Sequence, residues 1–109
     1  MSYEVKTIAV FEKQAKRLIK KYGSLKNELT ALVQELKEKP ETGTSLGKNC
    51  YKIRLFVAAK GKGKRGGARI ITNVVITHKT VYLISVYDKS EIGNISDKQL
   101  SELLKFIPD

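Results

Sequence analysis

The sequence lacks features that several classes of protein require. Its single cysteine, Cys50, cannot close an internal disulfide, and one cysteine with one histidine is too few ligands for a Cys/His zinc site. No apolar run approaches the roughly 18 residues that would predict a membrane-spanning helix. The segment from Met1 to Lys6 has none of the apolar character of a secretory signal. We therefore expect a cytoplasmic protein that uses no metal or cofactor and does not associate with membranes.

What the sequence has in excess is positive charge. Its 109 residues, 41% hydrophobic and 29% charged, are enough for one hydrophobic core, so we expect a single domain over residues 1–109. The net charge is +10, and the segment 42–80 carries nine basic residues without one Asp or Glu. A solubility charge would normally be interspersed with acids, whereas charge gathered in one segment favours a polyanionic partner such as nucleic acid.

The first forty residues predict a strand followed by two helices. Residues 3–8 alternate between apolar and polar, as a half-buried strand does. Two helical stripes follow, separated by Gly23 and ended by Pro40, and the short link between them implies an antiparallel hairpin. The stripes are Phe11, Ala15, Leu18 and Tyr22, then Leu25, Leu29, Leu32 and Leu36.

The rest of the chain predicts three strands and a last helix. Strands are expected at 50–59, 68–77 and 81–87, and their close succession predicts an antiparallel meander. Ser96 is placed to cap the final helix. The order β-α-α-β-β-β-α indicates an α+β fold, with a small antiparallel β-sheet packed against the N-terminal helical hairpin.

A glycine-rich basic loop joins the first two meander strands. The run 61–66 matches the dinucleotide-binding string G-x-G-x-x-G, but a strand follows it where that site needs a helix. We expect the loop to turn the chain and to bring cations to RNA or ribosome phosphates, the alternative being a solvated hairpin. The cations are Lys60, Lys62, Lys64 and Arg65.

Strand periodicity also predicts a cationic patch on the sheet. Lys52 and Arg54 are two residues apart and therefore share one face of their strand. If Arg69 of the next strand faces the same way, the three form a patch that Tyr87 and Lys89 can reach from the third strand. The alternative is a set of exposed basic side chains with no shared task. Like charges gathered without a carboxylate favour an anion between them.

Such a patch suits phosphodiester cleavage by an RNA 2′-hydroxyl. Lysine and arginine can stabilise the pentavalent phosphate directly. A lysine among cations has a lowered pKa, so Lys52 is the better proton-transfer candidate, because arginine stays protonated. We interpret His78 as a turn residue and Cys50 as a packing residue.

Four segments resemble the HigB branch of the RelE/ParE toxin superfamily. They are the aromatic-led basic segment 11–18, the segment 51–54, the run 61–71 with its Gly-Lys-Arg-Gly-Gly-Ala-Arg sequence, and 81–90. The resemblance implies a toxin of a type II toxin-antitoxin pair that enters the ribosomal A site, cleaves mRNA without a metal ion and so inhibits translation. It implies catalytic roles for Lys52, Arg54, Arg69, Lys89 and Tyr87. Ile95 stands where some relatives have a tyrosine, so that either Tyr87 or a lysine alone would transfer the proton.

The resemblance also implies partners. It predicts a cognate antitoxin, of the helix-turn-helix HigA-like kind, through which alone the pair would bind DNA, together with the ribosome and mRNA. Two other functions stay open at this point. One is a non-enzymatic ParE-like gyrase poison, against which the basic segment argues. The other is a basic nucleic-acid-binding module, for which the segment offers few aromatic residues to stack on bases.

Overall fold

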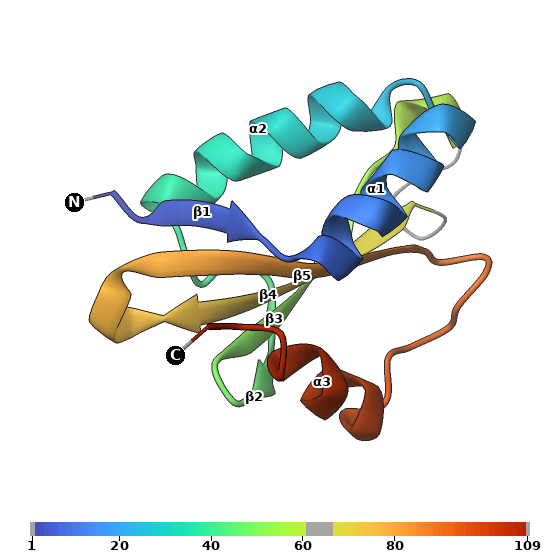
Figure 1. Ribbon diagram of the computed structural model, residues 1–109. Coiled ribbons are helices and arrows are strands. Elements are labelled where there is room, and N and C mark those ends of the chain that lie inside the picture. Colours follow the sequence, from blue (N-terminus) through green and yellow to red (C-terminus); the bar gives the residue numbers. More distant parts are fainter. Residues whose placement is uncertain (1, 61–66, 109) are drawn as a thin grey trace.

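A computed structural model describes residues 2–60 and 67–108 of the chain and places helices on both faces of one twisted sheet (Figure 1). Helices α1 and α2 lie on one face and α3 lies on the other. The helices are α1 (Ala9–Lys21), α2 (Leu25–Glu38) and α3 (Asp97–Leu104), with short 3-10 turns η1 (Ala58–Lys60) and η3 (Ile76–His78). The strands are β1 (Glu4–Thr7), β2 (Thr44–Gly47), β3 (Cys50–Leu55), β4 (Ala68–Val75) and β5 (Thr80–Asp88).

The sheet has the strand order β1-β5-β4-β3-β2. The antiparallel meander of β3, β4 and β5 is confirmed, and the α+β fold with its N-terminal helical hairpin is confirmed with it. Two features differ from the expectation. Strand β1 pairs with β5 in parallel, so the sheet is mixed. Strand β2 lies between Pro40 and the strand expected from residue 50, where no strand was predicted, and its sequence Thr-Ser-Leu-Gly shows too little alternation to indicate one.

The helical stripes are buried as expected. Phe11, Ala15 and Leu18 of α1 face the sheet, as do the leucines of α2. Tyr22 follows the last residue of α1 and caps it through its backbone, whose N–H donates to the Leu18 carbonyl at 2.8 Å. Ser24 precedes α2, but its hydroxyl accepts from the Ala59 backbone N–H at 2.9 Å rather than capping its own helix. The helical hairpin is thereby tied to η1, next to the end of β3.

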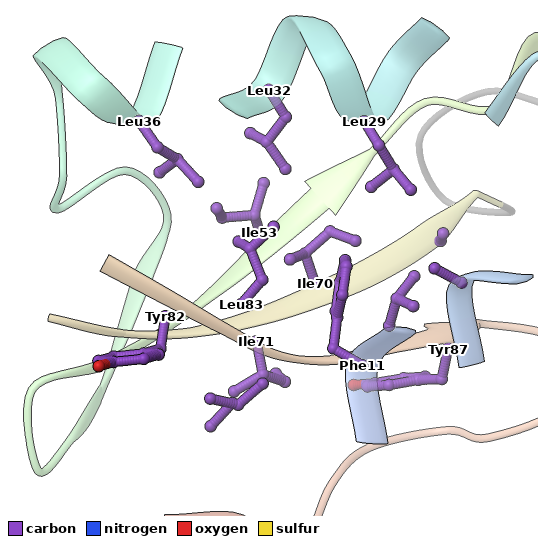
Figure 2. Close-up of a cluster of buried hydrophobic side chains, with 14 of the residues drawn as sticks. Phe11, Leu29, Leu32, Leu36, Ile53, Ile70, Ile71, Tyr82, Leu83 and Tyr87 are labelled. Atoms are coloured by element: carbon purple, nitrogen blue, oxygen red, sulfur yellow. The ribbon is translucent and has the colours of Figure 1, made fainter. Parts of the chain in front are cut away.

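The core occupies both faces of the sheet (Figure 2). Ile53 and Ile70 pack beneath the leucines of α2, while Ile71 and Tyr82 project from the opposite face, where α3 lies. Every residue of β5 is buried, so this central strand is covered on both sides. Among the described residues, the two charged side chains buried in the sheet, Arg69 and Asp88, both lie near the Asp88 end of β5.

Candidate active site on the sheet

Three strands bring an arginine, a second arginine and a tyrosine into one row. Arg54 of β3 lies directly opposite Arg69 of β4, and Arg69 lies opposite Tyr87 of β5. Residues paired in this way point to the same side of an antiparallel sheet. The structure therefore brings together three of the residues expected in the cationic patch, and Lys52, two residues before Arg54 in β3, lies on the same face. We call Arg54, Arg69 and Tyr87 the arginine–tyrosine row.

The two guanidinium groups differ in their surroundings. Arg54 is exposed, whereas Arg69 is only 4% exposed and donates from Nη1 to the Ala68 carbonyl at 3.2 Å. Burial lowers the pKa of Arg69, the neighbouring Arg54 charge lowers it further, and Tyr87 opposes the change. Arginine keeps its charge in proteins even where burial lowers its pKa. Two like charges side by side are relieved by an anion, and a phosphate can accept from both.

Tyr87 contributes a protonated phenol to the row. Its side chain is 4% exposed, and burial raises the pKa of Tyr87 against the effects of the Arg69 charge and the Ile95 backbone amide. The hydroxyl lies near that amide but forms no hydrogen bond of normal geometry with the described residues. A phenol whose pKa is raised keeps its proton at neutral pH and can donate it. It also lies beside the backbone of Ile95.

Two lysines expected at the site contact the segment that connects β5 to α3. The Lys52 ammonium donates to Asn94 Oδ1 at 3.4 Å, and that of Lys89 donates to the Gly93 carbonyl at 2.7 Å. Both side chains are half-buried. The connecting segment therefore lies beside the arginine–tyrosine row and holds its two flanking lysines.

Lys60 has a structural partner that the sequence did not indicate. Its ammonium is almost fully buried and forms an ion pair with Asp88, which also accepts from the Tyr22 hydroxyl at 2.7 Å and the Ser90 hydroxyl at 2.7 Å. Burial alone would raise the pKa of Asp88, but the hydrogen bonds from Lys60, Ser90 and Tyr22 outweigh it and hold this pKa well below its usual range. The structure thus engages Lys60 within the protein, where we expected it to meet RNA.

The remaining expected residues are placed as follows. Lys62, Lys64 and Arg65 lie outside the described residues. The strand that follows them is held to β5, because the Lys89 backbone N–H donates to the Gly67 carbonyl at 3.1 Å. Within residues 2–60 and 67–108, no three His, Cys, Asp or Glu side chains gather as metal ligands, and no helix is long and apolar enough to cross a membrane.

A pocket of about 330 Å³ lies beside the row, between β5, its connecting segment and α3. Tyr87 lines it, as do apolar side chains of the connecting segment and of α3. Sequence reasoning missed this pocket and also missed Asp88. The pocket was missed because the elements that line it are far apart in the chain. Asp88 was missed because a single acid next to Lys89 in the sequence is ordinarily solvated.

Comparisons with known proteins identify a matching family and two solved structures with a similar fold. A family model described as the RelE toxin of the RelE/RelB toxin-antitoxin system matches residues 8–107. A structure of an E. coli RelE toxin mutant in the free state is 24% identical, with a TM-score of 0.61, and covers 99% of this chain and 100% of its own. The isolated E. coli RelE toxin is 20% identical, with a TM-score of 0.62 over 97% of this chain and 100% of its own. These two likenesses establish the shared fold.

Proposed function

The chain belongs to the RelE toxin family, and from that premise we propose that it is a ribosome-dependent endoribonuclease that cleaves mRNA in the A site without a metal ion. The observation that carries the proposal is the arginine–tyrosine row, in which two positive charges and a protonated phenol lie side by side. A gyrase poison or a plain binding module would have no use for a proton donor in this place.

The row suits attack by an RNA 2′-hydroxyl on the adjacent phosphorus. The 2′-oxygen forms a bond to phosphorus, its proton passes to a base, and the bond to the 5′-oxygen breaks. Arg54 and Arg69 stabilise the charge of the pentavalent phosphate, as fixed donors do in other phosphoryl and acyl transfers. Tyr87 protonates the departing 5′-oxygen, and Lys52 or Lys89, released from its contact with the connecting segment and acting as the neutral amine, takes the 2′-proton. The products are a 2′,3′-cyclic phosphate and a 5′-hydroxyl.

The proposal extends to the protein's partners and to its cellular location. Family membership implies an antitoxin, and the resemblance of the basic run 61–71 to the HigB branch supports a HigA-like helix-turn-helix partner that would carry all DNA binding. We keep Lys62, Lys64 and Arg65 as ribosome contacts and place the toxin in the cytoplasm. We do not retain Lys60 among the proposed ribosome contacts, because Asp88 neutralises its charge.

The test is cleavage of a defined mRNA on programmed ribosomes by antitoxin-free protein in the presence of EDTA. Wild type should cut within the A-site codon, and Arg69→Ala and Arg54→Ala should each slow cutting by about 100-fold or more. Lys26→Ala, an exposed cation on α2, is the matched control and should cut normally. Absence of cutting by folded wild-type protein would overturn the proposal in favour of gyrase poisoning or simple binding.

A further inference from the structure

The pocket beside the row has apolar walls and two glutamines. Ile92, Ile95, Leu103 and Phe106 supply the walls, and two of these are open to solvent, with Ile92 43% and Phe106 58% exposed. Gln14 reaches the pocket from α1, and Gln99 reaches it from α3. Apolar surface beside a cationic row resembles the surroundings of a nucleobase whose phosphate is held nearby.

The carbonyl oxygen of Gln14 is committed within the protein. Gln14 Oε1 accepts from the Val86 backbone N–H at 3.0 Å and from the Ser85 hydroxyl at 3.2 Å. It thereby provides an acceptor for the backbone of β5 beyond the Thr7–Leu83 pair, where the pairing of β5 with β1 ends. Because a backbone N–H can only donate, the amide orientation is fixed. The Gln14 NH₂ group keeps two donors without a partner among the described residues.

Gln99 is fixed in the same way. Its Oε1 accepts from the Ser96 backbone N–H at 2.8 Å, as part of the capping box of α3. Its NH₂ group likewise has no partner among the described residues. The carboxylate at the pocket, Glu102, is exposed and paired with Lys105 at 3.4 Å. The uncommitted amide groups of the pocket are therefore hydrogen-bond donors.

A pair of donors distinguishes guanine from adenine. Guanine carries two adjacent acceptors, O6 and N7, whereas adenine has a donor, its N6 amino group, beside N7. We propose that this pocket binds a guanine base of the RNA, with the amides of Gln14 and Gln99 donating to O6 and N7. The inference rests on the proposed function, because the arginine–tyrosine row must hold the neighbouring phosphate. The same pocket could instead receive an apolar side chain of the antitoxin, but such an occupant would leave the two amides unpaired.

The experiment measures binding apart from cleavage. The probes are the trinucleotides A-A-G and A-A-A with 2′-O-methyl riboses, which cannot be cleaved because the attacking hydroxyl is blocked. They are titrated into ¹⁵N-labelled protein, and the side-chain amide signals of Gln14 and Gln99 are followed by NMR. The variants Gln14→Glu and Gln99→Glu assign these signals by their loss. Each keeps the internal acceptor oxygen, so the strand edge and the helix cap stay satisfied.

We expect A-A-G to shift both amide signals and to bind on the order of tenfold more tightly than A-A-A. Each Glu variant should lose this preference, and Gln34→Glu, an exposed site on α2 with the same charge change, should keep it. Equal binding of the two probes, or unmoved Gln14 and Gln99 signals, would overturn the inference. Guanine preference without ribosomal cleavage would leave the pocket standing and overturn the proposed function instead.

Discussion

The Tyr87 hydroxyl is buried next to a cationic arginine without a hydrogen bond of its own in the described part of the chain. A buried hydroxyl without a partner costs stability, typically about 1–3 kcal/mol. An enzyme tolerates such a cost where the group has a chemical task. Stability and activity should therefore respond to its removal in opposite directions.

We predict that Tyr87→Phe leaves the urea midpoint unchanged or raises it, while it slows single-turnover cleavage on ribosomes by about 100-fold or more, the usual contribution of a general acid. A structural tyrosine would behave in the reverse way, with lower stability and intact cutting. Arg69→Lys, which keeps the charge but loses the guanidinium fork, serves as the intermediate case.

Asp88 is the second residue whose role can be measured. It is 1% exposed and anchors η1 through Lys60 and the end of α1 through Tyr22. Breaking a buried pair leaves an uncompensated charge, so Asp88→Asn should lower the free energy of unfolding by about 3–5 kcal/mol. The double variant Lys60→Met/Asp88→Asn should recover part of that loss in urea denaturation. Equal loss in the single and double variants would contradict the ion-pair role.

The low pKa of Asp88 predicts how the free energy of unfolding falls at acidic pH. A pKa held below its usual range means that the stabilisation is complete above the unfolded-state pKa of about 3.9 and is lost as pH falls toward the folded-state value. Wild type should therefore lose stability between about pH 4 and pH 2. Asp88→Asn should show a shallower acid limb over that window, as measured by urea midpoints at each pH.

At the scale of elements, hydrophobic periodicity was sufficient to predict each helix or strand that buries one clear apolar stripe. The leucine spacing of α2 and the alternation in β3 both correspond to buried positions, as at Leu25, Leu36 and Ile53. The sequence did not predict strand β2, because this strand is short and polar and pairs with β3 across a tight turn. Lys48 and Asn49 adopt left-handed φ values of 55° and 59° there, as a tight hairpin requires. The parallel pairing of β1 with β5 joins opposite ends of the chain, and no local pattern encodes it.

The start of β4 approaches β3 so closely that only glycine fits. A Cβ added at Gly67 would lie 2.1 Å from the Leu55 carbonyl oxygen, whereas one at Gly23 would meet nothing within 4 Å. Gly67→Ala should push the strands apart next to the Arg54–Arg69 pair and cost about 1–3 kcal/mol. Gly23→Ala should stay within about 0.5 kcal/mol of wild type. Thermal unfolding of the two variants provides the comparison, and equal effects would contradict the steric account.

At the scale of the molecule, the cationic patch was predictable but its members were not all distinguishable. Alternation placed Lys52 and Arg54 on one face, and the hairpin register then aligned Arg54 with Arg69. Lys60 looked equivalent to its neighbours, because its partner Asp88 lies 28 residues further along the chain. No sequence pattern indicated a role for Gln14, because its side chain accepts from the backbone of Val86, which lies 72 residues further along the chain.

Net charge and site charge make different contributions to RNA binding, and salt separates them. For single strands, each phosphate neutralised adds about −0.7 to the slope of log affinity against log salt. Arg54→Gln and Lys26→Gln remove the same charge, the first from the arginine–tyrosine row and the second from the outer surface of α2. We expect only Arg54→Gln to make the slope for a 2′-O-methyl oligonucleotide shallower by about 0.7, because only Arg54 would hold a phosphate. Equal changes in the two variants would mean that the +10 charge acts as a diffuse field and that the row is not where RNA binds.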